Sequence, residues 1–458
     1  MNEARISHPQ DISLRDQAEA IASGELSASE LLNVTLARIE ERDGALDSIA
    51  DVFAPQSAQM SREAPAGPLH GVPIAIKDQF ALPWRAPRDG AFKSPYGIAP
   101  GESGVFRRLR DAGAVVVAVS NMHEFGLGST GHVSAYGPCA NPWDPSRCSG
   151  GSSSGSAAAV AARLVAGAIG TDSGGSIRFP CAYCGVTGLK HTWGQVPRDG
   201  FTHGYLTLGA PGPICRDAAD ARLLAEALLA RPLEQRPTKG LRVGLPRAQL
   251  WSDLDPEVDA ACSEAVERLG EAGIEFREVS LAGVEHALIA TVLLISLEGL
   301  PAAKPELEAE INPHLSPLVR ALTKSQLLVP SIALLKSNRV RAQIRRSIAA
   351  TLREVDALAW PSTPAPAPLI EEPTVRLPSG DYPADFANVR LGGVANLAGV
   401  PAASVPCGFT EAGLPIGLQL LAPWQQDARL LDLAELLEVF TERRYVEAVP
   451  PLALETAA

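Results

Sequence analysis

Apolar residues follow two patterns along this chain, a helical period near 3.6 and short continuous runs typical of buried strands. The continuous runs predict strands at Val72–Ile76, Ala114–Val119, Val165–Gly170, Leu241–Leu245, Ile274–Val279, Asp356–Trp360, Ala402–Val405 and Ile416–Leu421. The helical pattern predicts helices at Leu14–Ser23, Ala28–Arg42, Gly104–Asp111, Ser156–Leu164, Pro256–Ala272 and Ala428–Phe440. Strands that alternate with helices in this way favour a helix-covered sheet.

No Pro/Gly-rich linker divides the chain into two independently patterned halves. We therefore expect residues 1–458 to form a single large α/β domain, whose mixed, mostly buried sheet is covered by helices on both faces. Within it we expect N-terminal helices over 1–65, a core over 66–235, a mainly helical cover over 236–355 and a return to the sheet over 356–458. The Pro/Ala/Ser-rich segment Ala54–Pro68 is interpreted as a connection.

Composition narrows the choice of partners and location. The net charge of -12 and the pI near 5.3 argue against a nucleic-acid or anionic membrane surface. Neither a signal peptide nor an apolar run of membrane-spanning length is apparent, so a cytoplasmic location is expected. The seven cysteines are expected to be free thiols, and Cys181 and Cys184 to be small buried apolar residues. The eight histidines form no ligand motif, so neither a metal nor another cofactor is expected.

The stretch Cys148–Pro180 holds two clusters of glycine and serine. Such composition also occurs in flexible linkers. Here, however, the apolar residues Val160, Leu164, Val165 and Ile169 lie between the two clusters. They predict a buried helix and a buried strand, so we interpret the stretch as a functional site.

Ser176 is a candidate nucleophile because it follows two glycines at the expected carboxyl end of a strand. Gly174 and Gly175 allow backbone N–H groups to converge there, and such donors stabilise an oxyanion. A serine nucleophile needs a base. Lys77 ends an apolar strand, where desolvation would favour its neutral form. On spacing alone, Lys77 could equally be a surface lysine whose stem lies along the protein.

Several motifs in order resemble the amidase signature family. They are the two clusters at Gly150–Ala162 and Gly170–Pro180, the flanking segments Gly71–Asp78, Asn141–Trp143 and Cys184–Lys190, and the downstream segments Asn396–Pro401 and Gly413–Gln419. The resemblance covers about residues 65–425. It implies the amidase signature fold and hydrolysis of a small amide by water, with carbamates and esters as further substrate classes.

The resemblance also implies roles for individual residues. Ser176 would be the nucleophile, Ser153 the proton relay and Lys77 the base, with a cis peptide bond at Ser152–Ser153. Backbone N–H groups of the loop would form the oxyanion hole, and they belong to Ser173, Gly174, Gly175 and Ser176. Leu127 would touch the substrate. We further expect the charged pair Asp172 and Arg178 to brace the serine loops.

Two positions depart from the family pattern. Ser154 stands where relatives usually have glycine, which adds a hydroxyl to the cluster and leaves the choice of relay open. His191 stands where relatives usually have proline and affects only a loop.

Three alternatives compete with the amidase interpretation. Gly151–Gly155 also fits a nucleophile elbow, with Ser153 attacking in a Ser/His/Asp esterase, although Pro142–Arg147 is a poor preceding strand. The chain could instead be the glutaminase-type component of a tRNA-dependent amidotransferase, which hydrolyses glutamine and works with a partner protein. A phosphate-binding loop is disfavoured because neither cluster continues into Gly-Lys-Ser/Thr.

The sequence does not name the acyl or amine half of the substrate. Helical residues around Leu297–Leu335 are expected to form part of the substrate pocket. The oligomeric state stays open, a homo-oligomer included.

Overall fold

The computed structural model describes residues 9–92, 99–202, 207–299, 316–326, 328–441 and 448–451. The strands of its main sheet are β1 Ile49–Val52, β2 Pro73–Lys77, β3 Val115–Ser120, β6 Gly167–Asp172, β7 Thr187–Lys190, β8 Ala210–Cys215, β9 Arg242–Leu245, β10 Glu275–Glu278, β11 Ala357–Pro361, β14 Ala402–Phe409 and β15 Pro415–Leu421. Two smaller sheets pair β4 Ala140–Asn141 with β5 Asp144–Cys148, and β12 Thr374–Leu377 with β13 Gly380–Pro383.

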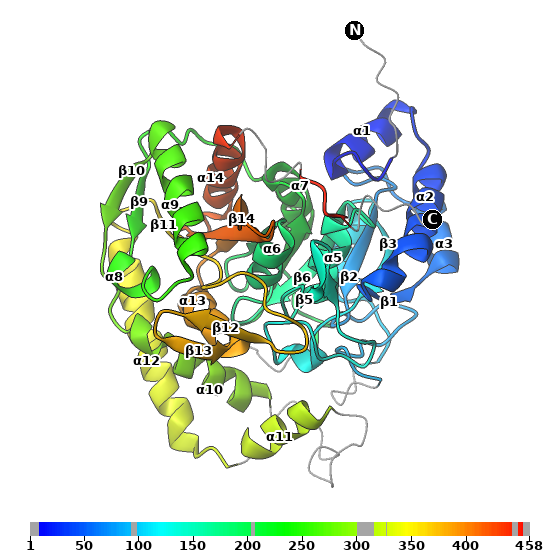
Figure 1. The fold of residues 1–458 in the computed structure, drawn as a ribbon. Coiled ribbons are helices and arrows are strands. Elements are labelled where there is room, and N and C mark those ends of the chain that lie inside the picture. The colour runs from blue at the N-terminus through cyan, green and yellow to red at the C-terminus, as the bar shows by residue number, and fades with distance from the viewer. Residues whose placement is uncertain are drawn as a thin grey trace.

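The main sheet has eleven strands in the order β1-β3-β2-β6-β8-β7-β14-β15-β11-β9-β10. Strands β3, β2 and β6 are parallel to one another, as are β11, β9 and β10. Between these groups, β8, β7, β14 and β15 pair antiparallel. The prediction of one large α/β domain with a mixed sheet is therefore confirmed (Figure 1).

The helices are α1 Leu14–Ser23, α2 Ala28–Arg42, α3 Ala54–Glu63, α4 Gly104–Asp111, α5 Ser154–Ala161, α6 Arg178–Cys184, α7 Ala218–Leu229, α8 Arg247–Leu250, α9 Pro256–Glu271, α10 Ala287–Gly299, α11 Pro317–Gln326, α12 Ser331–Thr351, α13 Ala384–Ala398 and α14 Asp427–Phe440. Helices α5 and α6 pack on one face of the sheet, and α7, α9 and α14 pack on the other. The two faces of the sheet are thus both covered, which buries its apolar strands.

The alternation of side chains along β2 directs Lys77 to the face that α5 covers. Ile74 and Ile76 belong to the core cluster that contains α7, α9 and α14, whereas Ala75 belongs to the cluster around α5. Since side chains alternate between the faces of a strand, Lys77 points to the same side as Ala75. The first serine cluster begins α5, so the lysine and the serines meet there.

Some elements differ from the sequence-based expectation. Ala54–Glu63 forms α3 and is not a connection; Pro55 at the first turn suits a helix start. The stretch before the first serine cluster forms β5, despite a composition that is poor for a strand. This strand pairs with β4 and forms a single bridge to Leu369, and it lies outside the main sheet.

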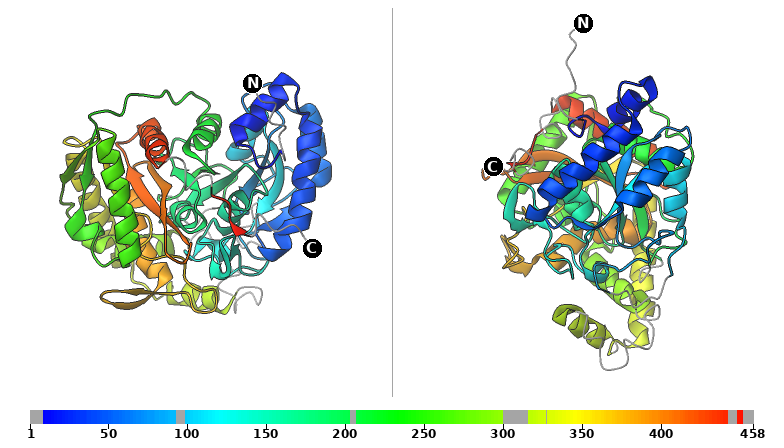
Figure 2. Two further views of the ribbon diagram at one scale, coloured as in Figure 1. Left: turned by 45° about the horizontal axis from the view of Figure 1, so that its top comes forward. Right: turned by 90° about the vertical axis from the view of Figure 1, so that its right-hand side faces the viewer.

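The predicted cover region, 236–355, contains strands β9 and β10 and helices α8, α9, α10, α11 and α12 among its described residues. Helices α10 and α12 pack against each other and against α13, while α11 lies at the periphery (Figures 1 and 2). Residues 300–315 of this region lie outside the described residues. Among the helices in the described ranges, none combines the length and apolarity needed to cross a bilayer. All seven cysteines are free and buried.

Candidate active site

Lys77 lies at the end of β2 and is completely buried. Its Nζ donates hydrogen bonds to Ser152 Oγ at 2.7 Å, Ser153 Oγ at 3.0 Å and Thr171 Oγ1 at 2.9 Å. Burial lowers the pKa of Lys77 to about 7, although Asp172 and Asp89 attract the charged form. Lys77 is therefore a buried amine that can be neutral near physiological pH, and the alternative of a surface lysine is wrong.

The three hydroxyls around Lys77 differ in their other partners. Thr171 Oγ1 donates to Gln79 Oε1 at 2.6 Å. Ser153 Oγ donates to the carbonyl oxygen of Thr171 and accepts from its N–H, both at 3.2 Å. Among the described residues, the hydrogen-bond partner recorded for Ser152 Oγ is Lys77 alone. The hydroxyl protons of Thr171 and Ser153 are thus donated to other acceptors, whereas the hydroxyl of Ser152 is free to donate its proton to the lone pair of a neutral Lys77.

The cis peptide bond of this loop joins Gly151 to Ser152, one residue earlier than expected. The expectation of a cis bond at Ser152–Ser153 is therefore wrong. Because Ser152 and Ser153 are adjacent and identical, the sequence alone does not show which of them follows the cis peptide bond. Their hydrogen bonds, and not the position of the cis bond, distinguish the two hydroxyls.

Ser176 is half-buried and lies at the wall of a pocket, together with Ser173 and Gly174. Its carbonyl oxygen accepts the N–H of Ser153 at 3.2 Å, which ties the second serine cluster to the first. The structure therefore brings Lys77, both cluster serines and the Ser176 loop into one place.

Asp172 organises the Ser176 loop from inside the protein. Its carboxylate accepts the N–H groups of Gly175 at 2.8 Å and of Ile177 at 3.2 Å. The Gly175 N–H is thus directed to Asp172, in contrast to the expectation that it faces the substrate. The N–H groups of Ser173, Gly174 and Ser176 remain as candidate oxyanion donors.

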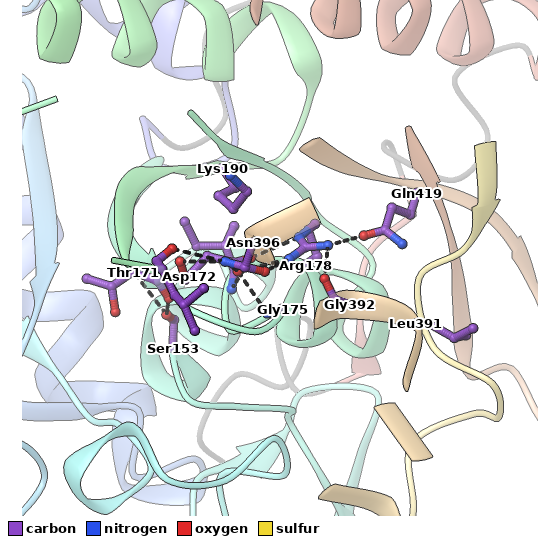
Figure 3. A network of polar contacts seen from close by, with 12 residues as sticks. Ser153, Thr171, Asp172, Gly175, Arg178, Lys190, Leu391, Gly392, Asn396 and Gln419 are labelled. Atoms are coloured by element: carbon purple, nitrogen blue, oxygen red, sulfur yellow. Dashed lines mark hydrogen bonds and ion pairs between the residues drawn. The ribbon is translucent and has the colours of Figure 1, made fainter. Parts of the chain in front are cut away.

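Arg178 connects this loop to α13 and β15 (Figure 3). It forms a fully buried ion pair with Asp172 and also bonds Gln419, Asn396 and the carbonyl oxygen of Gly392. Burial alone would raise the pKa of Asp172, but Arg178 lowers it to about 2. Asp172 is therefore charged, and the bracing contacts that we predicted for this pair are present.

A pocket of about 310 Å³ opens beside Ser176. Its walls come from the loop before the serine clusters, the Ser176 loop, α6, α10, α11 and the start of α13, and the lining residues are Gly126, Leu127, Gly128, Ser129, Ser173, Gly174, Ser176, Phe179, Val292, Ile295, Ser296, Gln326, Pro383, Asp385, Phe386 and Val389. Leu127 lies in the wall, and its contact with a substrate stays a prediction.

The expected contribution of Leu297–Leu335 to the pocket is small among the described residues. Gln326 lines the pocket from that range, while α10 contributes residues just before it. Sequence reasoning missed the contribution of α13. Asp385 was a usable signal, because an acidic residue is favourable in the first turn of a helix.

Within the described ranges, no group of three or more His, Cys, Asp or Glu side chains is arranged to hold a metal ion. Cys181 and Cys184 are both buried, and burial raises the pKa of each thiol well above its ordinary value. These two thiols are therefore not activated for redox chemistry.

Comparison with known proteins identifies the family. The family model Amidase matches residues 30–431. The chain is 36% identical to a glutamyl-tRNA(Gln) amidotransferase subunit of Azotobacter vinelandii, over 94% of this chain and 98% of that protein. A crystal structure of an amidase superposes with a TM-score of 0.88 at 32% identity, covering 93% of this chain and 99% of the other.

A solved glutamyl-tRNA(Gln) amidotransferase subunit from Thermotoga maritima is also similar, with a TM-score of 0.80, 25% identity and 99% of each chain covered. The similarity to both kinds of protein extends over nearly the full length of the chain. This protein therefore belongs to the amidase signature family.

Proposed function

We propose that this protein hydrolyses carboxylic amides through an acyl-enzyme formed on Ser176. The observation that carries the proposal is the buried Lys77, whose pKa is lowered to about 7 and which bonds the serine hydroxyls beside the pocket. A neutral amine can accept a proton, and a hydroxyl beside such a base becomes a nucleophile or a relay.

In the proposed reaction, Lys77 accepts the proton of Ser152 while Ser152 accepts the proton of Ser176. Ser176 Oγ then bonds to the amide carbon, and the carbonyl oxygen becomes an oxyanion held by N–H groups of the loop. As the C–N bond breaks, the proton returns through Ser152 to the leaving amine. Water repeats the sequence on the ester and releases the carboxylic acid.

Ser152 is the proposed relay because its proton is not committed to another acceptor among the described residues. Ser153 was the relay suggested by the resemblance, and it also contacts Lys77. Its own proton, however, has the carbonyl oxygen of Thr171 as an acceptor. We therefore assign Ser153 a positioning role that holds the two serine clusters together.

The nucleophile-elbow alternative fits less well. Ser153 is fully buried, and its hydroxyl contacts a lysine and backbone groups, not a histidine. A Ser/His/Asp esterase requires an imidazole within hydrogen-bonding distance of the attacking serine.

A second candidate function is the glutamine-hydrolysing step of a tRNA-dependent amidotransferase, with other proteins of that enzyme as partners. The specific observation that favours it is the full-length similarity to glutamyl-tRNA(Gln) amidotransferase chains. Both candidate functions use the same proposed chemistry on Ser176. They differ in the substrate and in the need for partner proteins.

Hydrolysis assays on the purified chain test the proposal. We expect turnover of simple amides and esters that persists in the presence of a chelator. Ser176→Ala should abolish it, whereas Ser29→Ala, an exposed serine on α2, should leave it unchanged. Activity that a chelator removes and zinc restores would contradict the proposal. Glutamine hydrolysis that requires added partner proteins would instead support the second candidate.

A further inference from the structure

The walls of the pocket beside Ser176 are mainly apolar. Leu127, Phe179, Val292, Ile295 and Val389 contribute side chains from four different segments of the chain. Helix α10 lies directly against the Ser176 loop: a methyl group added at Gly174 would lie 3.3 Å from Thr291 Cγ2 and 3.5 Å from Ile295 Cδ1. An acyl group on Ser176 would therefore be surrounded by hydrocarbon.

Two of the polar residues in the wall, Ser129 and Asp385, already have hydrogen-bond partners within the protein. Ser129 donates its N–H to Asp385 Oδ1, and its hydroxyl accepts a hydrogen bond from Asn388 Nδ2 at 3.0 Å. These contacts join the loop to the start of α13 and leave fewer polar atoms for a ligand. Specific recognition of a polar acyl group would need such atoms to face the pocket.

The formal charge of the pocket is negative. Among the described residues, Asp385 is the one charged residue that lines the pocket, and none of the lining residues there is a lysine, arginine or histidine. The amino end of α13 could attract an anion, but Asp385 already occupies its first turn. A carboxylate carried into this pocket would lose its hydration without gaining a counter-charge.

The acyl half of free glutamine carries both a carboxylate and an ammonium group. Asp385 could pair with the ammonium, but no cationic side chain among the described lining residues meets the carboxylate. This pocket therefore disfavours glutamine, even though the full-length similarity to amidotransferase chains suggests glutamine as a substrate. An aryl or alkyl acyl group meets no such penalty, and an ammonium group could pair with Asp385. Building on the proposed amide hydrolysis, we propose that the protein acts on amides with a neutral, apolar acyl group and does not use free glutamine.

The test is a panel of primary amides of similar length that differ in the end of the acyl group. The panel comprises hexanamide and benzamide as neutral members, 6-aminohexanamide as the cationic member, and adipic acid monoamide and glutamine as members with a carboxylate. We expect kcat/KM to be at least about 100-fold higher for the neutral amides than for the carboxylate-bearing ones. The cationic amide should be intermediate.

Two substitutions probe the origin of this preference. Asp385→Asn keeps an oxygen to accept the Ser129 N–H but removes the charge, so the ratio of kcat/KM for adipic acid monoamide to that for hexanamide should rise about tenfold. Val389→Lys adds a cation to the wall and should raise the same ratio further. Asp381→Asn, an exposed aspartate on β13 outside the pocket, serves as the matched control and should leave the ratio unchanged.

Labelling of Ser176 by a fluorophosphonate separates the two proposals. If Ser176 does not react and no panel member is hydrolysed, the proposed function fails and this inference fails with it. If Ser176 reacts but glutamine is hydrolysed as efficiently as hexanamide, the amide-hydrolase proposal stands and the substrate inference is overturned. Protection of Ser176 from the label by hexanamide and not by glutamine would support the inference independently of turnover.

Discussion

At the scale of single residues, the burial of Lys77 has the largest chemical consequence. A lysine in water is almost entirely protonated at neutral pH and is no base. Complete burial lowers the pKa of Lys77 to about 7, because the charged form is deprived of water. Its hydrogen-bond partners in the described part of the chain are hydroxyl groups, and these can exchange protons with it.

The pH dependence of activity should therefore report Lys77. Below pH of about 7 its ammonium form dominates in the folded protein, so kcat/KM should fall about tenfold per pH unit, and above it should level off. Lys77→Arg stays protonated and should be inactive throughout. A pH–rate profile of the wild type checks this. Highest activity near pH of about 5 would contradict a neutral lysine as the base.

Substitution of the two neighbouring serines should have unequal effects. Ser152→Ala removes the proposed relay and should reduce kcat by about 10²–10⁴-fold. Ser153→Ala removes two hydrogen bonds to the backbone of Thr171 and one from Lys77, so it should reduce stability by about 1–3 kcal/mol and affect kcat much less. Steady-state kinetics and denaturant unfolding of both variants decide the matter. The opposite ranking in kcat would return the relay role to Ser153.

Sequence reasoning located the candidate residues but not all of their contacts. Lys77 and Ser176 were identifiable because each ends or follows an apolar run and each belongs to a family motif. The choice of Ser152 over Ser153 as the relay depends on the hydrogen bonds between Ser153 and Thr171, and Thr171 lies on a separate element, β6. The direction of the Gly175 N–H depends in the same way on Asp172, and neither contact has a local sequence pattern.

At the scale of elements, the Ser176 loop owes its shape to the segments packed around it. Arg178 contacts three elements around the loop (Figure 3). It pairs with Asp172 on β6, and it donates hydrogen bonds to Asn396 on α13 and to Gln419 on β15. The partners on α13 and β15 are distant in the sequence. Their combined effect is to hold the nucleophile loop against the end of the sheet.

Asp172→Asn should therefore be strongly destabilising. It leaves Arg178 buried without its counter-charge, which costs about 3–5 kcal/mol.

The contribution of this ion pair to stability also depends on pH. The pKa of Asp172 is lowered from 3.8 to about 2, so the stabilising contribution is present above pH 3.8 and is lost as the pH falls towards 2. Urea unfolding at several pH values measures the difference. The exposed pair Asp381 and Arg376 is the control, and Asp381→Asn should leave the free energy of unfolding nearly unchanged. Equal costs for the two variants would contradict a bracing role.

Gly175→Ala should disrupt the nucleophile loop. Gly175 has φ of +127°, and an added Cβ would lie 2.0 Å from Phe179 Cζ. We expect kcat to fall at least about 100-fold, because the oxyanion donors on either side would move. Gly413→Ala has a similar positive φ of +78° but no heavy atom within 4 Å of the added Cβ.

The Gly413 variant therefore controls for backbone strain alone, with an expected cost of about 1–3 kcal/mol in stability and unchanged kcat. Kinetics and thermal unfolding of both variants provide the comparison. Full activity in Gly175→Ala would show that the loop tolerates rearrangement.

At the scale of the whole molecule, the periodicity of the sequence predicted most central elements of the sheet. Helices α1, α2 and α4 begin and end where expected. Capping serines define their starts, and Gly24 in the left-handed conformation ends α1. Elements with weak local signals were missed. Strand β8, for example, contains two prolines and is held in the sheet by pairing with β6 and β7.

The whole fold also explains how one scaffold can serve different substrates. The proposed catalytic groups lie on the sheet, at the start of α5 and in the loop before α6, whereas most of the pocket comes from α10, α11, α13 and a separate loop. Changes in these outer elements can alter the acyl group that is accepted without moving Lys77 or Ser176. Full-length similarity to an amidotransferase chain therefore does not determine the substrate.

The central claim, an acyl-enzyme on Ser176, is tested most directly by labelling the intact protein with a fluorophosphonate and mapping the modified peptide by mass spectrometry. We predict a single label per chain, located on Ser176, that forms faster as the pH rises through about 7 and is absent in Ser176→Ala. Modification of Ser152 or Ser153 with Ser176 untouched would contradict it.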